Sequence, residues 1–125
     1  MRISRLLLAL FFVAAGVNHF VSPDTYLQIV PPFLPGRLTL IWISGVAEIA
    51  GGLGILFPQT RRLAGLGLIL LLLAVFPGNI YGALHGMKAW GWTLPTWLLW
   101  ARLPFQPLLI AWVYFACWKA KESPR

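Results

Sequence analysis

The chain has 125 residues, of which 59% are hydrophobic and only 10% are charged. Soluble domains typically carry about 25% charged residues, so this composition excludes an ordinary soluble domain and predicts an integral membrane protein. The net charge of +7 is not carried by basic stretches interleaved with aromatic residues, so we expect no nucleic-acid partner. Hydrocarbon about 30 Å thick requires about 20 residues per helix. We therefore predict an all-α, four-helix membrane bundle that forms one domain, residues 1–125.

The first membrane helix is expected at about residues 3–21, behind Arg2 and Arg5. This segment also resembles a secretory signal, because two arginines and an apolar core precede small residues at 13–15 that could form a cleavage site. The apolar run continues past that site, and cleavage would leave three helices with their ends on opposite sides of the membrane. We therefore expect an uncleaved helix.

An outer loop at 22–37 follows, and it starts with Ser22, a residue type that caps helices, then a proline and an acid. This pattern predicts a short surface helix through Tyr26. The helix cannot pass the proline pair that begins at Pro31, because proline restricts the residue before it to extended conformations. The chain then enters the second membrane helix, expected at 38–57.

Glu48 lies near the middle of that second helix. A carboxylate is costly to bury in an apolar layer, so it requires a partner. Small residues on the same helix, including Gly45 and Gly51, predict close packing against neighbouring helices, with Gly65 and Gly67 of the third helix as the complementary surface.

The inner turn at 58–62 joins the second helix to the third, which is expected at 63–84 as an antiparallel neighbour. Near the outer end of the third helix, Asn79 follows Pro77. Proline lacks an amide donor, so the carbonyl of Leu73 needs water, a side chain or a ligand as its donor.

The fourth helix ends at Trp118, and counting about twenty residues back gives a start near 98, so residues 98–118 cross the membrane. Arg102 and Gln106 then lie at the outer leaflet on one helix face, and prolines 104 and 107 fall in the first turns. The outer loop at 85–97 and the helix start are rich in tryptophan. We interpret these rings as an interfacial anchoring belt, with an aromatic ligand cage as the alternative; they are Trp90, Trp92, Trp97 and Trp100.

A cation at the depth of Arg102 needs compensation, and the chain offers three acids, Asp24, Glu48 and Glu122. Glu122 belongs to the opposite side of the membrane. The alternatives are an ion pair with Glu48, direct or bridged by Gln106, an ion pair with Asp24, or contact with lipid phosphate.

Polar residues of all four helices are expected at one level in the outer half of the bundle. Each also has a structural explanation: capping by Asn18, interfacial hydration of His19, interhelical hydrogen bonding by Asn79, and a structural ion pair for Glu48. The candidate ligand-binding site consists of Asn18, His19, Glu48, Asn79, Arg102 and Gln106. No catalytic residue is assignable.

Thiol exchange and metal chemistry are not expected. The chain has a single cysteine, Cys117, whereas dithiol exchange needs two. His19 and His85 do not have the spacing of a bis-histidine haem site, and no compact cluster of metal ligands occurs. We interpret Cys117 as a small buried hydrophobe.

Lysine and arginine are enriched on the cytoplasmic side of membrane proteins, and here they sort by loop. This predicts cytoplasmic N and C termini. The predicted inner side carries Arg2, Arg5, Arg61, Arg62, Lys119, Lys121 and Arg125, and the outer side carries Arg37, Lys88 and Arg102.

Several motifs together resemble the DoxX-like family of small bacterial membrane proteins, over most of the chain. That resemblance implies a multi-pass, four-helix bundle in the bacterial inner membrane. Some members of the family are associated with quinone-linked sulfur oxidation or with redox partner complexes. The motifs are Gly16-Val17-Asn18-His19-Phe20, Tyr26 with Ile29-Val30-Pro31, Ser44-Gly45-Val46-Ala47-Glu48-Ile49, Phe76-Pro77-Gly78-Asn79-Ile80-Tyr81 and Arg102-Leu103-Pro104-Phe105-Gln106.

The function that follows from this resemblance is a redox-associated or quinone-linked membrane subunit with a polar site in the outer leaflet. A quinone is the cofactor to consider, and the expected partners are the lipid bilayer, a redox partner protein or further copies of the chain. The alternative is a non-enzymatic interaction or scaffold protein in which the buried polar cluster is structural.

Overall fold

The computed structural model of the protein describes residues 2–30, 32–89 and 92–119. Pro31, Trp90 and the tail residues Lys121, Glu122 and Arg125, which entered the sequence analysis, lie outside these ranges. The elements in chain order are α1 (Arg2–Val21), α2 (Pro23–Leu27), α3 (Arg37–Ile55), α4 (Arg61–His85), β1 (Lys88–Ala89), β2 (Trp92–Thr93), α5 (Thr96–Tyr114) and the π-helix η1 (Phe115–Lys119).

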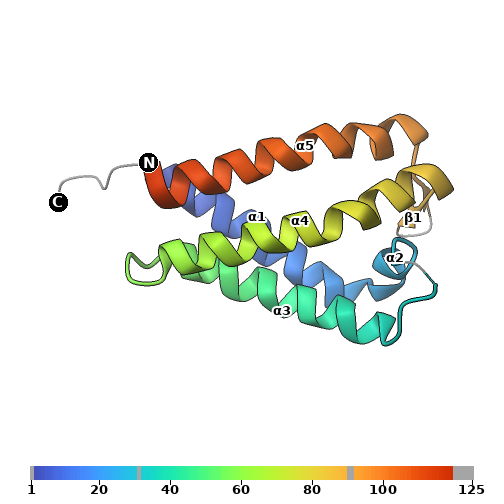
Figure 1. The fold of residues 1–125 in the computed structure, drawn as a ribbon, viewed down its shortest axis with the longest axis horizontal. Helices are drawn as coiled ribbons and strands as arrows, with labels where there is room; N and C mark the ends of the chain where they lie inside the picture. The colour runs from blue at the N-terminus through green and yellow to red at the C-terminus, as the bar shows by residue number, and fades with distance from the viewer. Residues whose placement is uncertain (1, 31, 90–91, 120–125) are drawn as a thin grey trace.

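The four long helices form an antiparallel bundle in which α1 begins and η1 ends at the same end of the molecule (Figure 1). The prediction of an all-helical protein with four long apolar helices is confirmed. By length and composition, each is able to cross a membrane; the four spans are Ile3–Val21, Arg37–Ile55, Arg61–His85 and Thr96–Trp118. The short helix α2 is also present where the sequence predicted it.

Two local features differ from the expectations. The helix α5 starts at Thr96, so Pro104 and Pro107 lie inside the helix rather than in its first turns. The outer loop contains an antiparallel pair of two-residue strands, in which Lys88 faces Thr93. Two residues per strand are too few to show the alternating pattern by which strands are recognised in a sequence.

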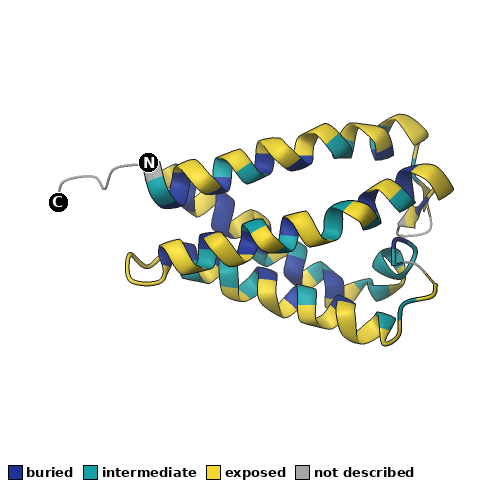
Figure 2. Cartoon of the chain, viewed as in Figure 1, coloured by how far each residue is buried: buried dark blue, intermediate teal, exposed yellow. Residues whose placement is uncertain are grey.

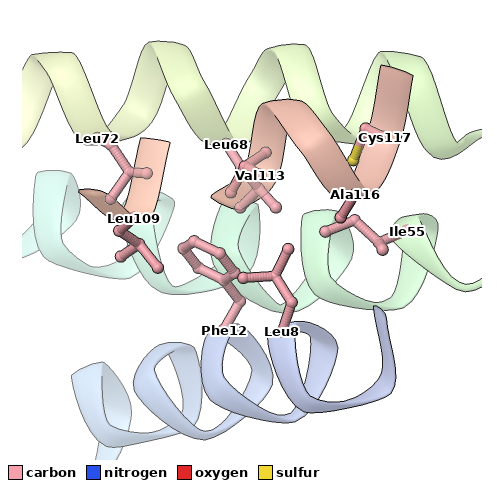
Figure 3. Packing of buried hydrophobic residues seen from close by; sticks show 9 residues of the cluster. All are labelled: Leu8, Phe12, Ile55, Leu68, Leu72, Leu109, Val113, Ala116 and Cys117. Atoms are coloured by element: carbon pink, nitrogen blue, oxygen red, sulfur yellow. The ribbon is translucent and has the colours of Figure 1, made fainter. Parts of the chain in front are cut away.

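The apolar core occupies the half of the bundle nearer the chain ends. Its side chains come from all four long helices and from η1, and they point toward one another (Figure 3). Cys117 is buried there, as predicted. Arg5 extends this packing by donating from Nε to the Ala116 carbonyl oxygen at 3.0 Å. The core consists of Leu8, Phe12, Ile55, Leu68, Leu72, Leu109, Val113, Ala116 and Cys117.

Large apolar side chains also cover the outside of the bundle, where much of the helical surface is exposed (Figure 2). Leu63 is 74% exposed, Leu70 56% and Leu108 67%. Soluble monomers rarely expose contiguous apolar surface on this scale, because it drives association or membrane insertion. The exposed apolar surface therefore agrees with the high hydrophobic content of the sequence.

Glycines set the distance between α1 and α3. A Cβ on Gly16 would lie 2.6 Å from the Gly45 carbonyl oxygen, and a Cβ on Gly52 would lie 3.0 Å from the Ala9 carbonyl oxygen. The predicted close packing of α3 is thus present. The predicted complementary surface is wrong, because Gly65 faces Cys117 and not α3. Only the three-dimensional arrangement shows which face of each helix meets which neighbour.

A further glycine, Gly67, provides a matched control for this packing, because nothing lies within 4 Å of a Cβ built there. We expect Gly16→Ala to cost about 1–3 kcal/mol, because the new methyl overlaps backbone that cannot move aside. Gly67→Ala should be neutral or stabilising, since alanine favours helix by about 1 kcal/mol. Thermal unfolding in detergent should show a loss of several degrees for Gly16→Ala alone. Equal melting temperatures for the two variants would contradict the close approach of α1 and α3.

Candidate functional site

A cavity of about 270 Å³ lies between the outer halves of the four long helices, beyond the apolar core. This volume is close to the lower end of the range for ligand pockets, roughly 300–1,000 Å³. Its apolar walls include Phe11, Phe12, Leu72, Phe105 and Leu109. Its polar lining is contributed by His19, Tyr26, Glu48, Asn79, Arg102 and Gln106.

Glu48 and His19 face each other across this cavity, with Glu48 Oε2 3.9 Å from His19 Nδ1. His19 Nδ1 also lies 2.7 Å from the Ala15 carbonyl oxygen. A carbonyl oxygen only accepts hydrogen bonds, so Nδ1 carries the proton and donates it to Ala15. In the neutral ring, Nε2 is then an acceptor.

Glu48 is 9% exposed, and its Oε2 is buried without a hydrogen-bond partner among the described residues. Leaving a buried polar atom unpaired costs on the order of 1–3 kcal/mol, and more for a charged group. Unpaired buried atoms in native structures call for an explanation, of which an absent ligand or water is one. The glycine contact between α1 and α3 brings this carboxylate to the histidine, since Gly45 packs against the Cβ of His19.

Tyr26 covers His19 from the outer side. The two rings are stacked, with centroids 4.0 Å apart and planes 12° apart. Asn18 Nδ2 donates to the Tyr26 hydroxyl at 2.7 Å. Burial raises the pKa of Tyr26 above its ordinary value of 10.0, so the phenol remains protonated at neutral pH. Asn18 itself does not line the cavity; it positions the tyrosine that does.

Two side chains hold the segment around α2 in place over the cavity. Arg37, the first residue of α3, donates through Nη2 to the carbonyl oxygens of Leu27 and Val30, the latter at 2.9 Å. A cation at the carboxyl end of a helix is favoured by the helix dipole. The Gln28 amide bonds both backbone groups of Lys88, each at 2.6 Å. Arg37 and Gln28 thus tie α2 to α3 and to β1.

A chain of side-chain hydrogen bonds joins α4 to α5. Arg102 Nη2 donates to Asn79 Oδ1 at 2.8 Å, and Asn79 Nδ2 donates to Gln106 Oε1 at 2.9 Å. Gln106 Nε2 then donates to the Leu72 carbonyl oxygen at 2.8 Å. Both amide oxygens are therefore satisfied within the chain. This arrangement supports the predicted interhelical role of Asn79.

The partner of Arg102 is an amide and not a carboxylate. Its second hydrogen bond runs from Nη1 to the Met87 sulfur at 3.3 Å. Within the described part of the chain, Arg102 makes no ion pair with Glu48 or Asp24. A bridge from Gln106 to Glu48 is likewise absent there, because the Gln106 amide bonds to Asn79 and Leu72. Counting residues along each helix gives the depth of a side chain but not its neighbour, so it could not reveal that Asn79 bonds both Arg102 and Gln106.

Five of the six candidate residues therefore line one cavity, but they form two groups. Asn79, Arg102 and Gln106 bond one another, whereas His19 and Glu48 leave acceptors open. Tyr26 was expected on a surface helix, and its place in the cavity was missed. The sequence signal for it was the inclusion of Tyr26 among the motifs that resemble the DoxX-like family.

The described tryptophans of the outer loop do not line the cavity. Trp92 is 75% exposed, Trp97 70% and Trp100 45%. This exposure suits the predicted interfacial belt better than the alternative of a ligand cage. Among the described residues, no group of three or more His, Cys, Asp and Glu side chains could hold a metal ion.

The chain matches a family over residues 8–117, from α1 to η1. It belongs to DUF8561, a family described as a domain of unknown function. The DUF8561 match includes the positions of all six candidate site residues. No curated protein matches the chain significantly. No solved structure does so either. The resemblance to DoxX-like proteins stays a prediction.

The two polar groups predict different effects on stability. Asn79→Leu removes the centre of the α4–α5 chain and leaves Arg102 Nη2 and Gln106 Oε1 without the partners they have in Asn79, so it should cost at least about 1–3 kcal/mol. Glu48→Gln removes a charge whose Oε2 has no hydrogen bond, so we expect no loss of stability. Thermal unfolding of both variants in the same detergent measures the difference. A large destabilisation by Glu48→Gln would show instead that this carboxylate is part of the structural network.

Proposed function

We propose that this DUF8561 protein is a DoxX-like, multi-pass protein of the bacterial inner membrane, with both termini in the cytoplasm. Four apolar helices and an apolar outer surface support insertion. Arg61 and Arg62 at the turn into α4 support the orientation, because cytoplasmic loops carry an excess of basic residues. In this orientation the polar cavity lies in the outer leaflet.

The orientation predicts which engineered cysteines an impermeant maleimide reaches in intact cells. Lys88→Cys, in the outer hairpin, should be labelled from outside. Arg62→Cys, at the inner turn, should be labelled only after the cells are permeabilised. Native Cys117 is buried, so the unmodified chain serves as the background. Labelling of Arg62→Cys in intact cells would reverse the assignment of the two sides.

We propose further that the cavity binds the headgroup of a quinone-type molecule, and that the protein is a quinone-linked subunit of a membrane redox system. The buried, unpaired Glu48 Oε2 carries this proposal. Together with the His19 ring, it offers acceptors to a hydroxyl group. Arg102 has five N–H donors, of which two are used within the chain. Arg102 therefore offers hydrogen-bond donors to an oxygen on the ring of the bound molecule.

Each side chain has a distinct task in this proposal. Glu48 accepts a hydrogen bond or a proton at Oε2, Arg102 donates to an oxygen, and Phe12 and Phe105 exclude water from the ring. A bound quinone would supply reversible two-electron, two-proton chemistry. The chain has one cysteine, and the described residues hold no metal cluster. A redox partner protein is therefore the expected route for the electrons.

The test is binding of a tail-free benzohydroquinone, whose hydroxyl groups can donate to Glu48, to the protein in nanodiscs under reducing conditions, monitored by tryptophan fluorescence. Glu48→Leu should raise the Kd by about tenfold, the equivalent of one lost hydrogen bond of about 1.4 kcal/mol. Glu48→Gln, which keeps an acceptor, should lie between Glu48→Leu and the native chain. Thr39→Ala, an exposed change on the same helix, should bind normally. Equal affinity of Glu48→Leu and the native chain, with both folded, would refute the proposal.

A scaffold function is the second candidate, because the α4–α5 hydrogen-bond chain is complete without any ligand. In that case the exposed Trp92 of the outer hairpin and Trp97 of α5 would contact a partner protein. The binding test separates the two candidates. A scaffold predicts no quinone binding by the native chain, whereas a quinone-linked subunit predicts binding that depends on Glu48.

A further inference from the structure

A second, apolar space lies beside the polar cavity. It measures about 470 Å³ and runs between the outer halves of α3 and α4, under the segment that follows α2. These helices lie side by side along the bundle (Figure 1). The walls are Leu40, Ile41 and Ser44 from α3 and Leu71, Ala74 and Pro77 from α4. We refer to this space as the α3–α4 groove.

The groove adjoins the polar cavity. Four residues line both spaces: His19, Tyr26, Ile29 and Val75. The stacked His19 and Tyr26 rings therefore form the boundary, with a polar side toward Glu48 and an apolar side toward the groove. A molecule that occupied both spaces would need a polar head and an apolar tail.

The groove also reaches the outer surface of the bundle. Leu40 is 41% exposed and Phe33 is 82% exposed; Ala74 is exposed as well and Ser44 is half-buried. The Ser44 hydroxyl donates to the Leu40 carbonyl oxygen of its own helix, so it presents little unmet polarity to a hydrocarbon chain. The groove therefore leads from the head site to the surface that would face lipid.

The opposite side of the cavity has an aromatic contact in place of a groove. Phe11 of α1 and Phe105 of α5 both line the cavity, and their rings meet edge to face with centroids 6.5 Å apart. This contact narrows the route between α1 and α5. The α3–α4 groove is thus a better route than the α1–α5 side for the apolar tail of a molecule bound in the cavity.

We infer that the α3–α4 groove holds the hydrocarbon tail of the same amphiphile whose head occupies the polar cavity, and that this molecule enters sideways between α3 and α4. The inference rests on the proposed headgroup site and adds the class of ligand, a long-tailed lipid-soluble molecule rather than a small water-soluble one. The adjacency of the two spaces at His19 and Tyr26, which line both, carries it.

The test compares the reduced forms of two probes that share one headgroup: 2,3-dimethoxy-5-methyl-1,4-benzohydroquinone and its decyl-tailed analogue, whose hydroxyl groups can donate to Glu48. Ala74→Phe fills the groove, and Ala111→Phe is the matched control, an equally exposed alanine on α5 that lines neither space. Ala74→Phe should weaken the tailed probe by about tenfold, which corresponds to displacing about two methylene groups. It should leave the tail-free probe unchanged, and Ala111→Phe should alter neither. Partitioning into the nanodisc is the same for all variants and cancels in the comparison.

A photoreactive diazirine at the end of the tail locates the tail on the native protein, so the result does not depend on the variant folding. We expect cross-links at residues 40–44 and 71–78. Cross-links at Phe11 or Phe105, or spread evenly around the bundle, would overturn the groove assignment. If the tail-free probe still bound through Glu48, the proposed function would stand. Loss of Glu48 dependence for both probes would instead overturn the headgroup site.

Discussion

The outer half of the bundle depends on the hydrogen bonds of Asn79. Its amide accepts from Arg102 and donates to Gln106, so it satisfies a cation and an amide inside the bundle. Leaving a buried polar group unpaired costs about 1–3 kcal/mol, so this chain favours one register of α4 against α5. The other end of the bundle also has polar contacts between helices, from Arg5 to the Ala116 carbonyl oxygen and from Trp112 to the Ser4 hydroxyl.

The same constraint draws attention to Glu48, because its Oε2 and Arg37 Nε are the buried side-chain atoms without a hydrogen-bond partner in the described part of the chain. The polar groups of the α4–α5 chain find partners on neighbouring helices, whereas Glu48 Oε2 does not find one among the described residues. The glycine contact between α1 and α3 places this carboxylate beside His19 and keeps both at the cavity. Hydrogen bonds within the chain explain Asn79 and Gln106, the proposed binding role would explain Glu48, and Arg102 takes part in both. One cavity thus contains groups held for two different reasons.

The outer loops take part in the site as well as connecting helices. Arg37 and Gln28 fix α2 against α3 and β1, and this fixes Tyr26 over His19. A loop held by side-chain bonds at both ends is rigid enough to form one wall of a cavity. Ile29, which follows α2, also packs in a second apolar cluster with Ala83, Met87 and Leu99, and this packing further fixes the wall.

The sequence by itself determined the membrane-type composition, four long apolar helices and the polar residues at one level, because these follow from hydropathy and from residue counts along a helix. The tertiary structure decided the partners. Arg102 bonds Asn79 rather than Glu48, and Tyr26 turns inward onto His19. Arg37 donates to the carbonyl oxygens of Leu27 and Val30 in the segment around α2. Pairing depends on the rotation and closeness of neighbouring helices, which glycine contacts set, and a periodic pattern in one helix does not contain that information.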